Sequence, residues 1–346
     1  MNAALKVRIA ELLGDGIGPE LARALHRVAD ALPLDFEFVP IDWSLETREA
    51  RGDAVIDEAE RAIRETCLAL KYPTETRGRS PNALIRRRLG LNVIYRPAVS
   101  LAGIASNFGK PVNLHIVRVA TGGTYEDPGM HIGEDSAVSL RMVERGPCTA
   151  AATFAFELAR SHGYSVTSSS KHTIQKATDG LFETVVEEVH DQYPDVPHRV
   201  ELFDALLGKV LLVPEDYQVV LVLNEYGDFL SDMAGGLIGS LGVAASGNYA
   251  LDADCEIELA LFDPAGGTAP DLAGRGVCNP TAMLLAFAML LDHVEHQDLG
   301  QALRQSLLGA IEAGEATQDL GGTLSTSEFT DGVIERVAKK VARTPR

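Results

Sequence analysis

An apolar run that changes directly into a helical pattern is the feature that most constrains how this chain can fold. The run covers residues 219–223 and stops at the turn-prone pair Asn224 and Gly227. A short unbroken apolar run of this kind is typical of a strand buried on both faces, as in a parallel sheet covered by helices. We therefore expect a buried strand that leads into a helix.

Two carboxylates follow on that helix, at Asp228 and Asp232. Residues four apart lie one turn from each other on the same helix face, about 5–6 Å apart at Cβ. Carboxylates held so close repel each other unless a positive charge lies between them, and Mg²⁺ accepts such oxygen ligands. From this stretch alone, a metal site and a pair of solvated surface acids both remain open.

The rest of the chain repeats the alternation of strands and helices. Strands are expected at 6–13 and 34–41, and an amphipathic helix at 57–70. This order predicts an α/β fold with a mostly parallel sheet covered by helices. The turn after the first strand reads GDGIGPE, and Pro19 interrupts the pattern G-x-G-x-x-G, so a standard Rossmann phosphate site is not expected.

Composition narrows the classes of partner. The 346 residues are 46% hydrophobic and carry a formal charge of −18, which indicates a folded globular protein and argues against nucleic acid or an anionic membrane as partners. No run approaches the roughly 20 apolar residues of a membrane span, and the N-terminus does not resemble a signal peptide. The four cysteines are widely spaced, so we expect reduced thiols and a cytoplasmic location.

Several basic and acidic residues stand at places where a site could form. Arg86, Arg96 and Arg118 can converge as carboxylate clamps, whereas Arg87 and Arg88 are interpreted as ordinary surface charges. Lys171 ends an expected strand and could be either a solvated residue or a proton relay. Asp204 heads an apolar helix, where an acid also suits the helix dipole. A Gly- and Pro-rich loop over 264–279 could approach a nucleotide closely.

Taken together, these motifs resemble the β-decarboxylating dehydrogenases, the family of isocitrate, homoisocitrate, 3-isopropylmalate and D-malate or tartrate dehydrogenases. The match covers nearly the whole chain. It comprises GDGIGPE, the pattern S-x-N-x-x-x-R from Ser80 to Arg86, RP at Arg96, Arg118 followed by Tyr125, Lys171 before a TDG turn, NEYGDFLSD, GTAPDLAG, NPTA and DLGGTLSTSEFTD. Each motif is weak by itself, but their order and spacing are specific.

The resemblance implies roles for particular residues. Arg86, Arg96 and Arg118 match the arginines that bind the malate part of the substrate, with Ser80 and Asn82 beside its third substituent. Asp204, Asp228 and Asp232 match the ligands of Mg²⁺ or Mn²⁺. Lys171 matches the proton relay and Tyr125 the acid that protonates the enolate. For the cofactor, the matching residues are Gly267, Thr268, Ala269, Asp271, Leu272 and Asn279.

The resemblance also implies the fold, the reaction and the assembly. It implies an isocitrate/isopropylmalate dehydrogenase-like two-domain fold with a mixed sheet flanked by helices. The expected large domain covers 1–97 plus 240–346, and the small domain covers 98–239 and carries the dimer contact. Lys171 and Asp204 are expected to serve the partner subunit of a homodimer. Asp271 stands where NADP-users tend to carry a basic residue, and an acid repels a 2′-phosphate, so NAD is the expected cofactor.

The implied reaction oxidises a small anionic (2R)-2-hydroxy acid. Metal bound to the hydroxyl acidifies it, Lys171 takes its proton and hydride leaves for NAD⁺. Carbon dioxide then leaves the β-keto acid, the metal stabilises the enolate, and Tyr125 donates a proton to carbon.

Several residues depart from the family pattern. Val119 and Ala120 replace an acid and an amide, Thr173 replaces an asparagine, Asp263 a glutamate and Gly266 a histidine. Polar contacts near the nicotinamide are therefore expected to be rearranged. A non-catalytic regulatory subunit of a heteromeric dehydrogenase is the alternative that these departures suggest.

Substrate choice depends on the helix that starts near Ser80. Ser80 and Asn82 favour an isocitrate-like substrate with a polar or anionic 3-substituent, because a site built for hydrogen bonds discriminates against apolar analogues. Homoisocitrate, 3-isopropylmalate and a phosphonomethylmalate remain alternatives, the last because Arg79, Arg87 and Arg88 lie nearby in the sequence.

Overall fold

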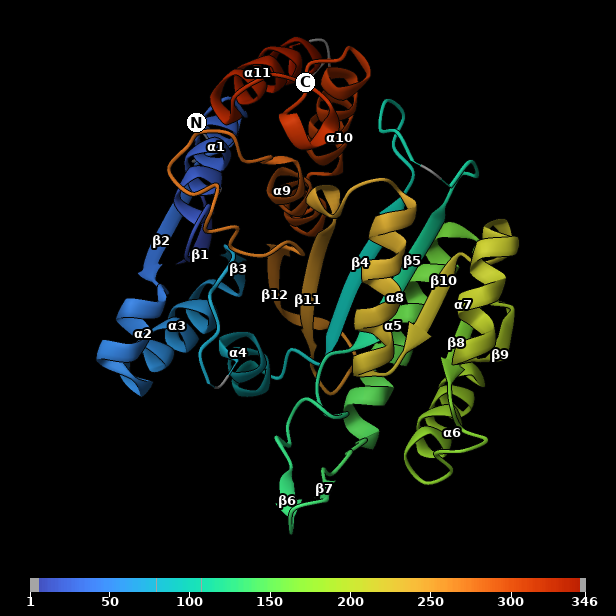
Figure 1. The fold of residues 1–346 in the computed structure, drawn as a ribbon. Coiled ribbons are helices and arrows are strands. Elements are labelled where there is room, and N and C mark those ends of the chain that lie inside the picture. The colour runs from blue at the N-terminus through green and yellow to red at the C-terminus, as the bar shows by residue number, and fades with distance from the viewer. Residues whose placement is uncertain (1–5, 79, 107, 343–346) are drawn as a thin grey trace.

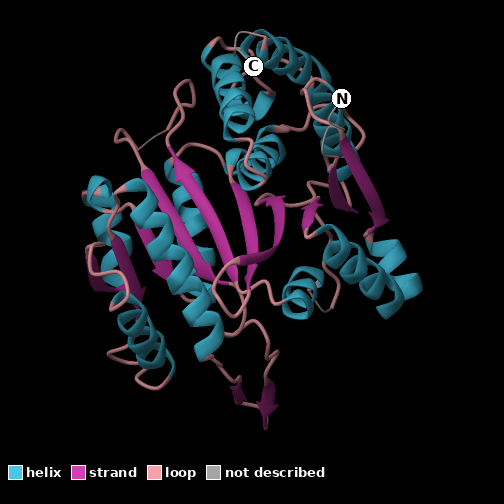
Figure 2. Ribbon diagram, turned by 180° about the vertical axis from the view of Figure 1, so that it is seen from behind, coloured by secondary structure: helices cyan, strands magenta, loops and turns pink. Residues whose placement is uncertain are grey.

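A ten-stranded mixed sheet with helices on both faces forms the body of the protein (Figures 1 and 2). The computed structural model describes residues 6–78, 80–106 and 108–342. The strands in sheet order are β2 (Phe36–Asp42), β1 (Val7–Leu13), β3 (Leu68–Lys71), β12 (Ile257–Pro264), β11 (Ala245–Leu251), β4 (Val93–Val99), β5 (Asn113–Val119), β10 (Val219–Val222), β8 (Val166–Ser170) and β9 (His198–Leu202). The predicted fold class is confirmed.

Helices follow most strands, as the alternation of the sequence predicts. They are α1 (Gly18–Asp30), α2 (Leu45–Arg51), α3 (Asp53–Thr66), α4 (Pro81–Leu89), α5 (Arg145–His162), α6 (Thr178–His190), α7 (Phe203–Leu212), α8 (Asn224–Leu237), α9 (Thr281–His293), α10 (Gln297–Glu312) and α11 (Thr326–Val341). Among the described residues, none of these helices is long and apolar enough to cross a membrane.

The centre of the sheet differs from its two ends. Strands at both ends pair in parallel, whereas β12, β11, β4 and β5 pair with one another in antiparallel fashion. The antiparallel centre brings the two parallel blocks into one sheet. Helix α8 lies in front of the central strands in Figure 1, and α5 lies behind them. Residues of β4 and β5 therefore face α8 and α5 alternately.

Two local expectations were wrong. Asn224 and Gly227 form no turn, because α8 begins at Asn224 directly after β10. The helix expected at 57–70 begins earlier, at Asp53, and ends at Thr66, so that Leu68–Lys71 forms strand β3. The short sequence LALK fits a helical and a strand pattern equally, and its pairing with β1 and β12 decides between them.

The predicted division into 1–97 plus 240–346 and 98–239 stays a prediction. Its first boundary falls inside β4, and the sheet continues across it from β11 to β5. One hydrophobic cluster also includes residues from both parts, such as Phe287 and Phe156. The core therefore joins the two proposed domains behind the central strands.

A small two-stranded arm, β6 (Met130–Ile132) and β7 (Ser136–Val138), projects from the body at the lower edge of Figure 1. Its large apolar side chains are exposed, with Met130 at 68% and Ile132 at 58%. Two strands alone are marginally stable in water. The arm is therefore a candidate contact surface.

Candidate active site

Three predicted site residues converge on the carboxylate of Asp228 in the second turn of α8. Arg118 donates through Nη1 to Oδ1, and Arg96 Nη1 lies 3.4 Å from the same oxygen. The Tyr125 hydroxyl donates to Oδ2 over 2.7 Å. The sequence prediction that these four residues share one site agrees with this geometry, although their chemical roles stay predictions.

Glycine at position 227 allows this convergence. A Cβ added to Gly227 would lie 2.6–2.8 Å from three side-chain carbons of Arg118, so the arginine could not cross the helix at this point. Asn224 holds the same guanidinium, because its Oδ1 accepts from Arg118 Nε at 2.9 Å and Nη2 at 2.7 Å. Its amide donates to the carbonyls of Ala120 and Gly122, and so fixes the loop toward Tyr125.

The electrostatics of the cluster keep Asp228 charged and Tyr125 protonated. Burial opposes ionisation of Asp228, but the nearby Arg118 charge and the Tyr125 hydrogen bond outweigh it, and the pKa of Asp228 is lowered. Burial, aided by the hydrogen bond to Asp228, raises the pKa of Tyr125 to about 12. Tyr125 therefore holds a proton throughout the neutral pH range.

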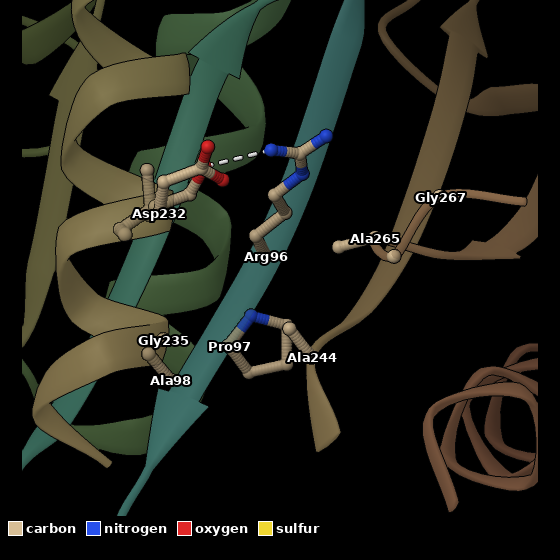
Figure 3. Close-up of a pocket in the computed structure, with 11 residues that line it drawn as sticks. Arg96, Pro97, Ala98, Asp232, Gly235, Ala244, Ala265 and Gly267 are labelled. Carbon is tan, nitrogen blue, oxygen red and sulfur yellow. Dashed lines mark hydrogen bonds between the residues drawn. The ribbon is translucent and has the colours of Figure 1, made fainter. Parts of the chain in front are cut away.

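A cavity of about 220 Å³ opens beside this cluster (Figure 3). Arg96, Ser231 and Asp232 line one side, and Gly266 and Gly267 line the other. Arg96 Nη1 donates to Ser231 Oγ at 2.7 Å, whereas its buried Nε has no hydrogen-bond partner among the residues that the structure describes. An unpaired buried donor beside a cavity favours a ligand with acceptor oxygens, because leaving it unpaired costs about 1–3 kcal/mol.

Arg86, the third predicted clamp residue, lies buried behind this group. Its Nε donates to Asn248 Oδ1 at 2.9 Å, and Asn248 Nδ2 donates to Asp263 Oδ1 at 3.1 Å. Burial, together with the neighbouring charges of Arg118 and Arg96, lowers the pKa of Arg86 to about 10, while Asp263 opposes the shift. The three arginines are therefore close enough to repel one another, as a site for a polyanion requires.

Asp263, one of the departures from the family pattern, completes a buried ion pair. Its Oδ2 lies 3.1 Å from Lys71 Nζ, and both side chains are nearly fully buried. Burial opposes its ionisation, but Lys71 and Arg86 outweigh it and the pKa of Asp263 is lowered. The shorter acid thus serves the arginine framework beneath the cavity.

The other departures have different surroundings. Val119 and Ala120 are buried, at 2% and 5% exposure, so neither side chain is presented to solvent. Thr173 is exposed in the segment after Lys171. Gly266 lines the cavity and leaves its side open.

Ser80 and Asn82 stand at the start of α4. Ser80 caps the helix as expected, accepting from the Ala83 amide at 3.3 Å, and Asn82 Oδ1 lies 3.4 Å from Thr74 Oγ1. Arg88 pairs with Asp57 and Glu60 on α3, which agrees with its interpretation as a surface charge.

Lys171 and Asp204 form a separate group. Lys171 Nζ donates to Asp204 Oδ1 at 2.6 Å, and the pair is open to solvent, at 33% and 66% side-chain exposure. Lys171 follows β8 and Asp204 opens α7, on the far side of β10 from Arg96 and Arg118. Among the described residues, neither makes a hydrogen bond or ion pair with Asp228 or Asp232. One chain therefore does not assemble all the predicted catalytic and metal-binding residues.

The predicted cofactor residues lie on the loop after β12. The Thr268 carbonyl accepts from Ile17 at 3.0 Å, and a Cβ on Gly16 would lie 2.0 Å from that oxygen, so the GDGIGPE turn holds the loop. Asn279 Nδ2 donates to Asp319 at 2.9 Å. Asp271 is exposed and Leu272 is half-buried. Gly267 faces the cavity, and Ala269 has a positive φ of 38°.

The residues present fit a hard divalent cation. Asp232 lies one helical turn after Asp228 and makes no hydrogen bond or ion pair within the described part of the chain, so its oxygens remain available. Carboxylate oxygens are the ligands that Mg²⁺ and Mn²⁺ prefer. Asp228 would have to exchange its arginine partners for the cation.

Sequence reasoning missed the residues that support this site. Asn224 was interpreted only as turn-prone, although it binds Arg118 and two carbonyls. A second network, in which Arg141 pairs with Asp179 and Glu225, was not foreseen. Buried acids at 179 and 225 could have been suspected only from their place inside otherwise apolar segments, and Arg141 comes from a loop with no pattern of its own.

Comparison with known proteins identifies the class that this fold and site define. The model of the isocitrate/isopropylmalate dehydrogenase family matches residues 8–333. Subunit 2 of the mitochondrial NAD isocitrate dehydrogenase of Schizosaccharomyces pombe is 33% identical, with 97% of this chain and 89% of that protein covered. The 3-isopropylmalate dehydrogenase of Archaeoglobus fulgidus is also 33% identical, with 94% and 98% covered.

A regulatory relative and a solved structure complete the comparison. A regulatory subunit of the mitochondrial NAD isocitrate dehydrogenase of Dictyostelium discoideum is 31% identical over 96% of this chain and 93% of its own. The crystal structure of isocitrate dehydrogenase from Methylococcus capsulatus matches with a TM-score of 0.85 and 31% identity, covering 96% of this chain and 99% of the other.

The chain belongs to the isocitrate/isopropylmalate dehydrogenase family. The predicted family and the predicted class, an NAD-dependent oxidative decarboxylating dehydrogenase, are confirmed.

Proposed function

We propose that this protein uses NAD and Mg²⁺ or Mn²⁺ to decarboxylate oxidatively an isocitrate-like (2R)-2-hydroxy acid with a polar or anionic 3-substituent. The observation that carries the proposal is the convergence of Arg96, Arg118 and Tyr125 on Asp228 beside a cavity. This arrangement supports the roles proposed for Arg96 and Arg118 in anion binding, for Tyr125 as proton donor and for Asp228 as metal ligand.

The charges of the Asp228 cluster favour a mechanism in which substrate and metal bind together. The single Asp228 carboxylate pairs with both Arg118 and Arg96, so one positive charge of the cluster remains uncompensated by it. Carboxylates of a substrate would take over both arginines and free the Asp228 oxygens for the cation. Neither exchange is favourable alone, because each would leave partly buried charges unpaired. We therefore expect metal and substrate to increase each other's affinity.

The chain's own residues would then position the substrate and move its protons. Arg86, Arg96 and Arg118 bind its carboxylates, and Lys171 of a second copy accepts the proton of its hydroxyl. Tyr125, whose pKa is raised to about 12, holds the proton that is later given to carbon. A bound divalent cation would acidify the substrate hydroxyl and stabilise the enolate as a Lewis acid.

A homodimer with shared sites is part of the proposal. The separation of the Lys171–Asp204 pair from Asp228 within one chain supports it. Exposed apolar residues support it as well, since Leu212 at the end of α7 is 70% exposed and Phe229, the residue after Asp228 on α8, is 61% exposed. Such an apolar surface favours association with a second protein surface.

The preference for a polar substituent rests on the start of α4. Ser80 and Asn82 present polar groups there, and Arg86 lies below them. A phosphonate receives less support than a carboxylate, because Arg87 lies 3.5 Å from Glu126 and Arg88 is engaged by two acids. Asp271, exposed on the cofactor loop, supports NAD over NADP. A cytoplasmic location is proposed on the cysteine pattern alone.

One absorbance screen tests the proposal. Purified protein with NAD⁺ and Mg²⁺ or Mn²⁺ is given isocitrate, homoisocitrate, 3-isopropylmalate, D-malate, tartrate and a phosphonomethylmalate in turn, and NADH formation is followed. The proposal expects fastest turnover with isocitrate or homoisocitrate and none after chelation of the metal. Fastest turnover with 3-isopropylmalate would contradict the assignment of the 3-substituent.

The second candidate function is that of a regulatory subunit. The departures at Val119, Ala120, Thr173, Asp263 and Gly266, together with a regulatory relative of similar identity, favour it. It expects binding of a 2-hydroxy acid, measured by calorimetry, with no NADH formed from any compound in the screen. Retention of Tyr125, Lys171 and all three aspartates favours the catalytic proposal.

A further inference from the structure

Three potential metal ligands meet at an edge of the sheet that the proposed reaction does not use. Glu187 and His190 lie on the last turn of α6, and His198 is the first residue of β9. One ligand atom from each side chain lies within 4.8 Å of the other two. The group is at the start of β9, whereas Asp204 follows the end of that strand.

The local chain fixes the spacing of the three residues. Glu187 and His190 are three apart on one helix, and therefore share a face. Two successive turns connect His190 to β9, with Tyr193 N donating to His190 O at 2.7 Å and Val196 N donating to Tyr193 O at 3.0 Å. The position of His198 relative to α6 is thus set by backbone hydrogen bonds.

Hydrogen bonds also set the tautomer of His198. Its Nε2 lies 3.0 Å from Ser168 Oγ, and that hydroxyl donates its only proton to Glu183 at 2.6 Å. Ser168 must therefore accept a proton from Nε2. In the neutral ring this leaves the lone pair on Nδ1, which lies 3.6 Å from Glu187 Oε2.

His190 is arranged in the same way. Its Nε2 lies 3.0 Å from the carbonyl of Val196, which can only accept, so Nε2 carries the proton and Nδ1 carries the lone pair. Metal-binding histidines almost always donate their second ring N–H to a carbonyl, a carboxylate or water. His190 has such a bond to the Val196 carbonyl, and His198 donates to the Ser168 hydroxyl, which in turn donates to the Glu183 carboxylate.

Glu187 and His198 bring two potential ligand atoms together at the mouth of this group. His198 Nδ1 lies 3.6 Å from Glu187 Oε2, which is a separation that one metal ion can bridge. The carboxylate is open to solvent and the imidazole is buried, so an ion could reach the group from the Glu187 side.

We propose that Glu187, His190 and His198 form a second metal site, selective for Zn²⁺ over Mg²⁺. Two imidazole nitrogens and one carboxylate suit zinc, with water as a fourth ligand. The three aspartates offer only oxygen, which suits Mg²⁺ or Mn²⁺. The two sites are thus distinguished by the chemistry of their donor atoms.

The second site ties together two elements that carry predicted catalytic residues. At the other end of α6, Asp179 accepts from the Lys171 amide at 2.7 Å. Strand β9 continues directly into α7, which begins next to Asp204. Zinc would therefore stabilise the frame around the Lys171–Asp204 pair without contacting substrate. The proposal does not depend on the proposed function.

Isothermal titration calorimetry tests the site. The protein carries no tag, is first stripped of metal and is then kept in saturating Mg²⁺, and Zn²⁺ is the titrant. The expected result is one zinc per chain, with binding weakened at least tenfold in Glu187→Gln and a Tm raised by zinc in the wild type only. Glu187 is 66% exposed, so this variant should fold. Glu188→Gln is the matched control, because Glu188 pairs with Arg145 instead and should leave zinc affinity unchanged.

Cobalt substitution gives a second readout. Co²⁺ bound by two nitrogens and a carboxylate in a tetrahedral site gives visible absorption bands that an octahedral oxygen site gives only weakly. These bands should be present in the wild type and in Glu188→Gln, and lost in Glu187→Gln and in His190→Gln. Absence of zinc binding in saturating Mg²⁺, or equal affinity in Glu187→Gln and Glu188→Gln, would overturn the proposal.

Discussion

The two groups of predicted catalytic residues differ in how far a single chain completes them. Around Asp228, Arg96 and Arg118 are largely buried, Tyr125 is 48% exposed, and each of the three has a partner that fixes its direction. The Lys171–Asp204 pair is open to solvent, and within the described residues its side chains pair with each other alone. A group braced by two buried arginines and an exposed ion pair therefore make up one predicted reaction centre.

The difference indicates which part of the centre each chain can build alone. Anion binding requires several fixed donors, and β4, β5 and α8 supply them from one sheet face. Lys171 and Asp204 are open to solvent and neutralise each other. We infer that the exposed pair is the part that a second copy would complete.

The largest loss of activity is expected from substitution of Asp228, at the centre of the arginine cluster. Asp228→Asn removes the charge that holds Arg118, Arg96 and the cation, and should lower kcat/KM by about 10³-fold or more, equivalent to several kcal/mol of transition-state stabilisation. NADH formation at saturating metal measures it. Near-normal turnover would show that Asp228 is not a metal ligand. Circular dichroism and the Tm verify that the variant is folded.

Mixing two inactive variants tests whether the groups belong to different chains. Asp228→Asn and Lys171→Met, unfolded and refolded together, should recover about a quarter of wild-type activity, because half the dimers are mixed and each mixed dimer has one intact site of two. The same variants refolded separately are the control. No recovery in mixtures shown by mass to contain mixed dimers would contradict the shared site.

The third prediction sharpens the role of α8 packing. Gly227→Ala puts a Cβ within 2.6–2.8 Å of Arg118 carbons, so it should displace the arginine, raise KM by about 10-fold and destabilise the fold by about 1–3 kcal/mol. Substrate kinetics and urea unfolding measure the two effects.

Gly236→Ala is the control on the same helix. Apart from its chain neighbours and the backbone of its own helix, no atom of the described residues lies within 4 Å of a Cβ added there, so the change should leave KM unaltered and stabilise the protein by up to about 1 kcal/mol through helix propensity. Equal effects of the two substitutions on KM would mean that Gly227 is not needed for the position of Arg118.

The family resemblance predicted the gathering of Arg96, Arg118, Tyr125 and Asp228, because each residue stands in a family motif. Local apolar patterns predicted an α/β fold with a mostly parallel sheet, and the mixed sheet was implied by the resemblance alone, since pairing partners far apart in the chain leave no local signal. The strand at 68–71 was misassigned for a related reason, because a run of four residues is too short to separate the two periodicities.

The residues that hold the site residues in position were the least predictable from the sequence. Asn224 and Gly227 are common turn residues, and only the position of Arg118 above the helix shows why an amide and a missing Cβ are needed there. The Asn248–Asp263–Lys71 group likewise depends on three strands meeting. Such partners are determined by tertiary packing, which the local sequence does not encode.

The smallest expected effect concerns the exposed pair. Lys171→Met should leave the free energy of unfolding almost unchanged, because exposed ion pairs contribute little to stability. Arg118→Met, by contrast, should destabilise by about 3 kcal/mol, because it leaves Asp228 partly buried and without its main partner. Urea unfolding at high and low salt compares them.

The pH dependence of the exposed pair has a definite sign. The hydrogen bond from Lys171 lowers the pKa of Asp204, so any stabilisation by the pair is present above the ordinary carboxylate pKa and is lost as pH falls through the lowered value. Lys171→Met should remove this dependence while abolishing turnover. A loss of stability as large as that of Arg118→Met would contradict the view that the pair is built for a partner and not for the fold of its own chain.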